Sequence, residues 1–266
     1  MQQPSVPVDH HTASFGWRSR LRAAAIHLVL SAAVALLAGL LVFALWYPYP
    51  YREVSGGREL FLLVVGVDIV LGPLITYSVF NLAKPRGELR RDLVVVVLLQ
   101  LAGLAYGLWT VQLARPVHMV FEYDRFRVVH QVDIPLELAD RVPPGIELAP
   151  LGGPTLLALR PFRSEEERTE LTLAALRGVH LSARPPLWQP YAAARARVLA
   201  AAQPAALLKS RFPQRAGEID AALRQGGREA ATAAYLPLVA RKSDVWTVLL
   251  DATTAEVIAF LPLDSF

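Results

Sequence analysis

Apolar residues concentrate before position 114 of the chain, where they form three long runs. The runs cover residues 24–46, 60–80 and 93–113. Each is close to the roughly 20 residues that an α-helix needs to cross the hydrocarbon core of a bilayer. Beyond Arg115 the sequence is mixed, charged and punctuated by proline. The pattern therefore predicts a membrane protein, with a three-helix transmembrane bundle over residues 18–115 and a separate domain over residues 116–266.

The first apolar run does not resemble a cleaved signal peptide. It is much longer than the roughly 7–15 apolar residues of such a peptide. It also ends in the aromatic and proline-rich sequence WYPYPY rather than in small residues. We therefore expect residues 24–46 to remain as a membrane helix.

Basic residues around the runs predict the orientation of the chain. Three arginines precede the first run, and the loop between the second and third runs carries Lys84, Arg86, Arg90 and Arg91. The first loop holds only two arginines, each beside a glutamate. The positive-inside rule then places the N-terminus and the second loop in the cytoplasm. In a bacterium, this predicts an inner-membrane protein with a disordered cytoplasmic tail over residues 1–17 and a periplasmic C-terminal domain.

The C-terminal part combines strand and helix patterns. Two runs rich in Val and Phe flank Tyr123, which predicts a strand, a tight turn and a second strand. Ser164, with Glu167 three residues later, predicts the start of a helix. Two alanine-rich stretches predict helices at residues 191–202 and 216–224, and three β-rich runs end the chain. We expect an α+β domain with helices against an antiparallel sheet.

Composition and motifs argue against several functions. The net charge is +4, but the basic residues are scattered, so nucleic acid is not an expected partner. The chain has no cysteine and no nucleotide-binding, hydrolase or zinc motif. We therefore expect no catalytic residues, no metal and no cofactor.

The second run contains the most unusual residues. Asp68 lies near its middle, and Pro73 removes a helical hydrogen bond at the carbonyl of Ile69. An ionisable group at this depth costs roughly 2.5–3.5 kcal/mol on insertion scales, so it usually faces protein or water. Gln100 in the third run lies at a similar depth. Two interpretations remain open: a protonated Asp68 bonded to Gln100 as internal glue, or a group that binds a partner.

Several segments together resemble the type IV pilin accessory proteins called TfpX/TfpZ. They are YPxPY, SGGRELF, VDIVLGPLIT, KPRGELRRDL, LLQLAGLAYGLWT and ARPVHMVFEYDRFRVV, which cover residues 47–129. The resemblance implies a chaperone-like inner-membrane protein rather than an enzyme. Its partners would be the major type IV pilin and membrane lipid.

The resemblance and the unusual second run lead to a hypothesis about the site. The face with Asp68, Gly72 and Pro73 would pack against the membrane helix of the pilin, while the sheet domain contacts its globular head. Gln100 would support this face. The other candidate partner-binding residues are Tyr49, Tyr51 and Arg58. A strand near residues 117–123 is a second candidate surface, as a sheet edge open to strand addition.

Two other function classes fit the sequence less well. A membrane enzyme acting on a lipid or cell-wall precursor would need convergent polar groups, which could come from Arg52, Glu53, Arg58, Glu59 and Asp124. A signalling protein would need a cytoplasmic output module, and the cytoplasmic segments are too short for one.

Overall fold

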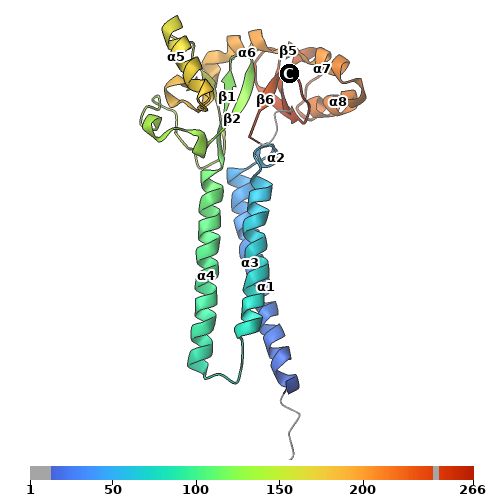
Figure 1. Cartoon of the computed structure of the whole chain (residues 1–266). Helices are drawn as coiled ribbons and strands as arrows, with labels where there is room; N and C mark the ends of the chain where they lie inside the picture. The colour runs from blue at the N-terminus through green and yellow to red at the C-terminus, as the bar shows by residue number, and fades with distance from the viewer. Residues whose placement is uncertain (1–12, 242–245) are drawn as a thin grey trace, which may run out of the picture. The chain divides into compact units, whose positions relative to one another are not determined.

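The computed structural model describes residues 13–241 and 246–266 (Figure 1). Most of the predicted tail, residues 1–12, lies outside the described part, and the first helix begins at Ala13. The chain divides into two compact units. The helix unit contains the chain up to Val42 and Glu59–Val111, and the sheet domain contains Phe43–Arg58 and Gln112–Phe266.

Three long helices confirm the predicted spans. They are α1 (Ala13–Leu41, continued by a π-helical turn, Val42–Trp46), α3 (Gly57–Val79) and α4 (Arg86–Leu113). All three are long and apolar enough to cross a membrane. At most 22% of the most apolar window of each helix is buried inside the chain, so lipid or another protein must cover the rest.

Glycines let the helices of this unit approach one another. A side chain at Gly107 of α4 would collide with Val64 of α3, and one at Gly39 of α1 would press on the ring of Phe61. Gly39 follows Ala35 by four residues, and Gly107 follows Gly103 by four, and such pairs of small residues favour close packing of helices in lipid. The seams therefore join α3 to both of its neighbours.

The first loop is part of the sheet domain rather than a simple connection. Its short helix α2 (Tyr51–Val54) places Tyr51 and Val54 in the largest hydrophobic cluster of that domain. The ring of Tyr51 meets Phe260 edge-on, with ring centroids 6.3 Å apart. Since both α2 residues are buried, the loop contributes to the stability of the domain.

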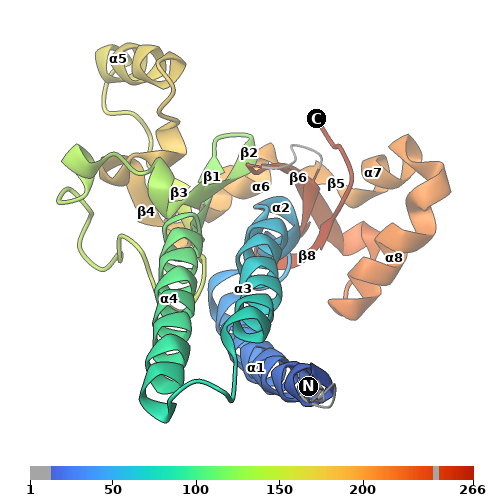
Figure 2. The ribbon, with the colours of Figure 1, turned by 60° about the horizontal axis from the view of Figure 1, so that its bottom comes forward.

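The described part of the sheet domain contains one sheet of eight strands (Figure 2). They are β1 (Pro116–Glu122), β2 (Arg125–His130), β3 (Thr155–Leu159), β4 (Trp188–Pro190), β5 (Gln203–Pro204), β6 (Ala233–Val239), β7 (Trp246–Asp251) and β8 (Val257–Leu261). Their order is β4-β3-β1-β2-β6-β7-β8, and β5 pairs with β6. The α+β class is confirmed, but the sheet is mixed, because β1 pairs with β3 and β2 with β6 in parallel.

The expectation that residues 117–123 form an open sheet edge is wrong. Strand β1 lies inside the sheet, antiparallel to β2 on one side and parallel to β3 on the other. Its backbone is therefore engaged on both sides, and strand addition there would break existing pairs. Within the described residues, the edge strands of the main path are β4 and β8.

In the described part of the domain, four helices of more than one turn accompany the sheet. They are α5 (Glu165–Leu176), α6 (Arg195–Ala201), α7 (Ala205–Arg211) and α8 (Ala216–Gln225). The predicted N-cap of α5 is confirmed, since Ser164 Oγ accepts a hydrogen bond from the Glu167 amide at 3.2 Å. Single 3₁₀ turns occupy Gln131–Asp133, Leu136–Leu138, Leu181–Ala183, Pro185–Leu187, Tyr191–Ala194, Pro213–Arg215 and Ala230–Thr232.

Among the described residues, the core of the sheet domain consists of three clusters. The largest joins β1, β2, β6 and β7 to α2 and α6, for example through Phe126 and Val198. A second packs β1 and β3 against Trp188, and a third packs β6–β8 against α7 and α8. Apolar burial on both sides of the sheet explains why its strands read as nearly continuous apolar runs.

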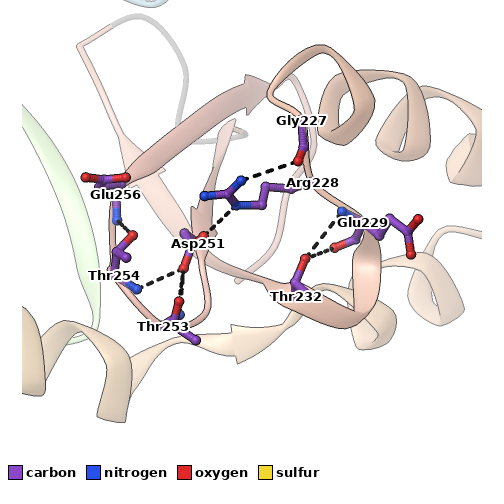
Figure 3. Close-up of polar contacts among 8 residues, drawn as sticks. All are labelled: Gly227, Arg228, Glu229, Thr232, Asp251, Thr253, Thr254 and Glu256. Carbon is purple, nitrogen blue, oxygen red and sulfur yellow. Dashed lines mark hydrogen bonds and ion pairs between the residues drawn. The ribbon is translucent and has the colours of Figure 1, made fainter.

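Asp251 fixes the turn between β7 and β8 (Figure 3). Its Oδ1 accepts hydrogen bonds from the amides of Thr253 and Thr254, both at 2.8 Å, and from the Thr253 hydroxyl at 2.6 Å. Its Oδ2 accepts one from Arg228 Nε at 2.5 Å. These bonds hold the pKa of Asp251 well below its usual range. The carboxylate therefore joins the hairpin to the segment after α8.

Candidate intramembrane binding site

Polar side chains meet in the middle of the helix unit because of their spacing. His27 and Ser31 lie four residues apart on α1, and Asp68, Gly72 and Thr76 follow at intervals of four on α3. Residues four apart share a helix face. Facing residues of α1 and α3 thus combine with Gln100 of α4. We call His27, Ser31, Asp68, Thr76 and Gln100 the polar cluster.

One chain of hydrogen bonds runs through this cluster. Gln100 Nε2 donates to the backbone carbonyl of Asp68 at 2.9 Å and lies 3.4 Å from Ser31 Oγ. Gln100 Oε1 contacts His27 Nε2, and His27 Nδ1 lies 2.5 Å from Thr76 Oγ1. All three helices are therefore tied together at this depth.

The proton positions along these hydrogen bonds follow from the backbone carbonyl of Asp68. The Asp68 carbonyl can only accept, so the amide NH₂ of Gln100 must face it and Oε1 must face His27. His27 Nε2 then carries the proton. In the neutral ring Nδ1 is an acceptor, and the Thr76 hydroxyl donates to it. The network is complete without the Asp68 carboxylate.

The Asp68 carboxylate stands outside this network. Among the described residues, no group donates a hydrogen bond to it. It lies over α4, where a side chain at Gly103 would come within 3.8 Å of Oδ1, so the glycine leaves room for the carboxylate. Asp68 is partly exposed and lines a groove of about 410 Å³ between the three helices. A carboxylate in such a place requires a partner or water.

The rest of the groove is mainly apolar. Its apolar lining includes Ile26, Leu30 and Val34 of α1, Val65 of α3, and Val97, Leu101 and Leu104 of α4. An apolar groove with few polar groups suits an amphipathic or membrane helix that carries one polar group opposite Asp68.

The structure separates the roles of the predicted residues. Gly72 faces inward, because a side chain there would collide with Gln100. Pro73 lies within α3, which continues to Val79. Gln100 does contact Asp68, but through the backbone carbonyl of Asp68 and not its carboxylate. Of the predicted face, Asp68 is thus the residue that lines the groove.

His27, Ser31 and Thr76 were not predicted as site residues. A single histidine in the first span has no recognisable motif around it. The available signal was its spacing of four from Ser31, which places two polar groups on one face of an otherwise apolar helix. Polar residues that face one another inside a membrane bundle mark a packing or binding surface.

The three candidates in the first loop differ in exposure. Tyr49 is 54% exposed and lies edge-on to Trp246, with ring centroids 6.4 Å apart. Tyr51 is buried in the core, where it cannot contact a partner directly. Arg58 is exposed and pairs with Glu53 at 2.6 Å. Tyr49 and Arg58 remain available as surface contacts.

Four of the five residues that could serve a membrane enzyme form ion pairs in the structure. Glu53 contacts both Arg58 and Arg52, and Asp124 contacts the adjacent Arg125 at 2.7 Å. Within the described residues, no group of three or more potential metal ligands is present.

Known proteins similar to this chain are fimbrial assembly proteins. The family model described as fimbrial assembly protein FimB matches residues 15–56. The chain is 36% identical over 242 residues to the fimbrial assembly protein of serogroup I from Dichelobacter nodosus, which covers 88% of this chain and 94% of that relative. The serogroup E1 protein of the same organism is 35% identical over 241 residues, with the same coverage.

A third relative, the Dichelobacter nodosus fimbrial assembly protein of serogroups C1 and C2, is 40% identical over 112 residues, which is 42% of this chain. No solved structure matches. Because the first two relatives align over nearly their whole length, the chain belongs to the family of fimbrial assembly proteins.

Proposed function

We propose that this protein assists the assembly of type IV pili by binding pilin subunits in the bacterial inner membrane. The role in assembly is supported by the names of its relatives, which are similar over 94% of their length. The three apolar helices support a membrane location. In this proposal the sheet domain lies in the periplasm, as the distribution of basic residues predicts.

The single observation that carries the binding role is the Asp68 carboxylate in the groove. The hydrogen bonds that join the helices use Gln100, His27 and Thr76, and the tie to Asp68 uses its backbone. The hydrogen bonds between the helices therefore do not require the aspartate side chain. A group that costs roughly 2.5–3.5 kcal/mol to insert is then best explained by a partner that it recognises.

The proposed occupant of the groove is the membrane helix of the pilin. A subunit that waits in the membrane must shield its apolar helix and any polar group on it. The groove offers both apolar walls and one carboxylate at mid-depth. The sheet domain would contact the globular head of the same subunit, with Tyr49 and Arg58 as exposed contact residues of the first loop.

Co-purification of the tagged full-length protein with the major pilin from the same genome tests the proposal. Asp68→Asn replaces the carboxyl group with an amide of nearly the same shape. Asp92→Asn is the matched control, because Asp92 pairs with Lys84 at 2.7 Å and does not line the groove. We expect the first variant to retain much less pilin and the second to retain as much as the wild type.

Two results would contradict this account. Pilin recovery unchanged in Asp68→Asn would make the side chain dispensable for binding. Absence of pilin from the wild-type preparation would leave a role in assembly without direct binding of the subunit.

A further inference from the structure

A second pocket lies in the sheet domain, where two parallel strands part. Strands β2 and β6 are paired only at Phe126 with Leu238 and at Arg127 with Val239. Beyond these pairs a pocket of about 630 Å³ opens. Ligands of mixed sheets commonly bind beyond the carboxyl ends of adjacent parallel strands. This location is therefore suited to a ligand.

The pocket is basic. Its charged and titratable lining consists of Arg125, Arg127, His130, Asp133, His180 and Arg241. Three arginines and one aspartate are the charged side chains of this lining, and each arginine is held by one carboxylate, from Asp124, Glu122 or Asp133. An arginine cluster of this kind favours an oxyanion such as a phosphate.

The arginines keep donors for a ligand. Asp124 accepts from Nε and one Nη of Arg125, and Glu122 accepts from Nε of Arg127. A guanidinium has five N–H donors in a planar fork. These ion pairs orient the arginine planes within the described structure and leave further N–H groups for an anion.

The surroundings of His130 also indicate that this pocket holds a ligand. It is 1% exposed, and its Nδ1 lies 3.0 Å from Asp133 Oδ2. The opposite oxygen of Asp133 accepts from Arg241 at 2.9 Å. Among the described residues, the buried His130 Nε2 has no hydrogen-bond partner. An unpartnered buried nitrogen in a basic pocket indicates a missing ligand or water.

Few residues along the chain separate the strands beside the pocket from the spans. His130 pairs with Pro116, and the next amide, of Gln131, donates to the Arg115 carbonyl at 3.0 Å, two residues after α4 ends. Arg241, which also lines the pocket, acts on the Tyr47 phenol. Burial raises the pKa of Tyr47, and the positive charge of Arg241 opposes this rise. Tyr47 directly follows the last residue of the first span.

We propose that this pocket binds the phosphate headgroup of an anionic membrane phospholipid. The arginine N–H donors recognise the phosphate, and only two residues join β1, beside the pocket, to the end of α4. Bound lipid would fix the sheet domain against the membrane at a site separate from the groove of Asp68. The proposal does not depend on pilin binding.

The test uses the full-length protein in nanodiscs of phosphatidylcholine with or without phosphatidylglycerol, followed by native mass spectrometry of the retained lipid. Arg127→Gln combined with Arg241→Gln removes two pocket charges. Arg168→Gln combined with Arg215→Gln removes two exposed, ion-paired charges elsewhere and serves as the control. We expect the pocket variant to lose retained phosphatidylglycerol by about fivefold per arginine, and the control to match the wild type.

A third variant separates charge from folding. Arg127→Lys combined with Arg241→Lys keeps both charges and should retain most of the lipid. Equal lipid retention in the pocket variant and the control would overturn the proposal. So would binding of inorganic phosphate by the pocket without any retained phosphatidylglycerol, because the ligand would then be the free anion.

Discussion

The side chain of Gln100 lies directly against the α-carbon of Gly72. No side chain can be added at Gly72 without displacing the amide of Gln100. That amide also donates to the carbonyl of Asp68 and contacts His27. The absence of a side chain at one position of α3 thus sets the hydrogen bonds between all three helices.

Replacement of this glycine should therefore disturb the bundle. Gly72→Ala places a methyl group where Gln100 lies, so the amide must move and its hydrogen bonds weaken. We expect a lower thermal stability of the solubilised protein. Gly66→Ala is the control, because nothing lies within 4 Å of a side chain there. Equal effects of the two changes would contradict the role of Gly72.

The sheet domain should lose stability in mild acid because of His118. This side chain is fully buried, with Nδ1 2.7 Å from Thr155 Oγ1 and Nε2 3.1 Å from the Leu148 carbonyl. Burial lowers the pKa of His118 from 6.5 to about 4. The unfolded chain thus binds a proton at this residue between those pH values, and the folded chain does not.

This difference in proton binding makes the folded domain less stable as the pH falls. The stability contributed by neutral His118 is complete above pH 6.5 and decreases as the pH falls toward 4. The loss is about 3 kcal/mol over that interval. Denaturant unfolding monitored by tryptophan fluorescence should show it, since the Trp188 ring lies 4.6 Å from the imidazole. In His118→Gln this part of the pH dependence should disappear; an unchanged profile would assign it to another group.

Two tyrosines of the first loop should behave differently when replaced by alanine. Tyr51→Ala opens a cavity in the core and should cost about 3–5 kcal/mol of unfolding free energy. Tyr49 is more than half exposed, so Tyr49→Ala should change stability by at most about 0.5 kcal/mol. If Tyr49→Ala nevertheless reduces pilin co-purification, Tyr49 is a contact residue. A stable Tyr51→Ala protein would refute the structural role of the loop.

The turn between β7 and β8 should depend on Asp251. Asp251→Ala leaves the amides of Thr253 and Thr254 and the guanidinium of Arg228 without their carboxylate. We expect the midpoint of thermal unfolding to fall by several degrees. The control is Asp264→Ala, which removes a single hydrogen bond of 3.2 Å from an exposed residue. A midpoint that shifts equally in both variants would show that the network in Figure 3 adds no stability.

Local patterns in the sequence were sufficient to predict most helices and strands, but not which strands pair in the sheet. The spans were predictable because only membrane helices need such long apolar runs. Ser164 and Glu167 marked the start of α5 through a bond between near neighbours. Strand β3 was missed because it directly follows a stretch rich in proline and glycine. The central position of β1 depends on β3, a strand more than thirty residues away, which no local pattern reveals.

Only part of the candidate site was predictable, because the rest depends on contacts between helices that local patterns do not reveal. Asp68 and Gln100 were recognisable because polar residues are costly inside a span. The mode of their contact was not, since it is Gly72 that allows the amide of Gln100 to reach the backbone of Asp68. The burial of Tyr51 was also hidden, because the aromatic residues of the loop resemble those of a membrane interface.

The most direct test of the central claim is photo-crosslinking in native membranes from two positions of α4. Leu101 and Leu99 are both exposed, but Leu101 lines the groove that contains Asp68 and Leu99 does not. A photoreactive residue at each position would report which protein lies within reach. Our account predicts a crosslink to pilin from position 101, lost in Asp68→Asn, and none from position 99. Equal crosslinks from both positions, or none from position 101, would contradict the binding of pilin in this groove.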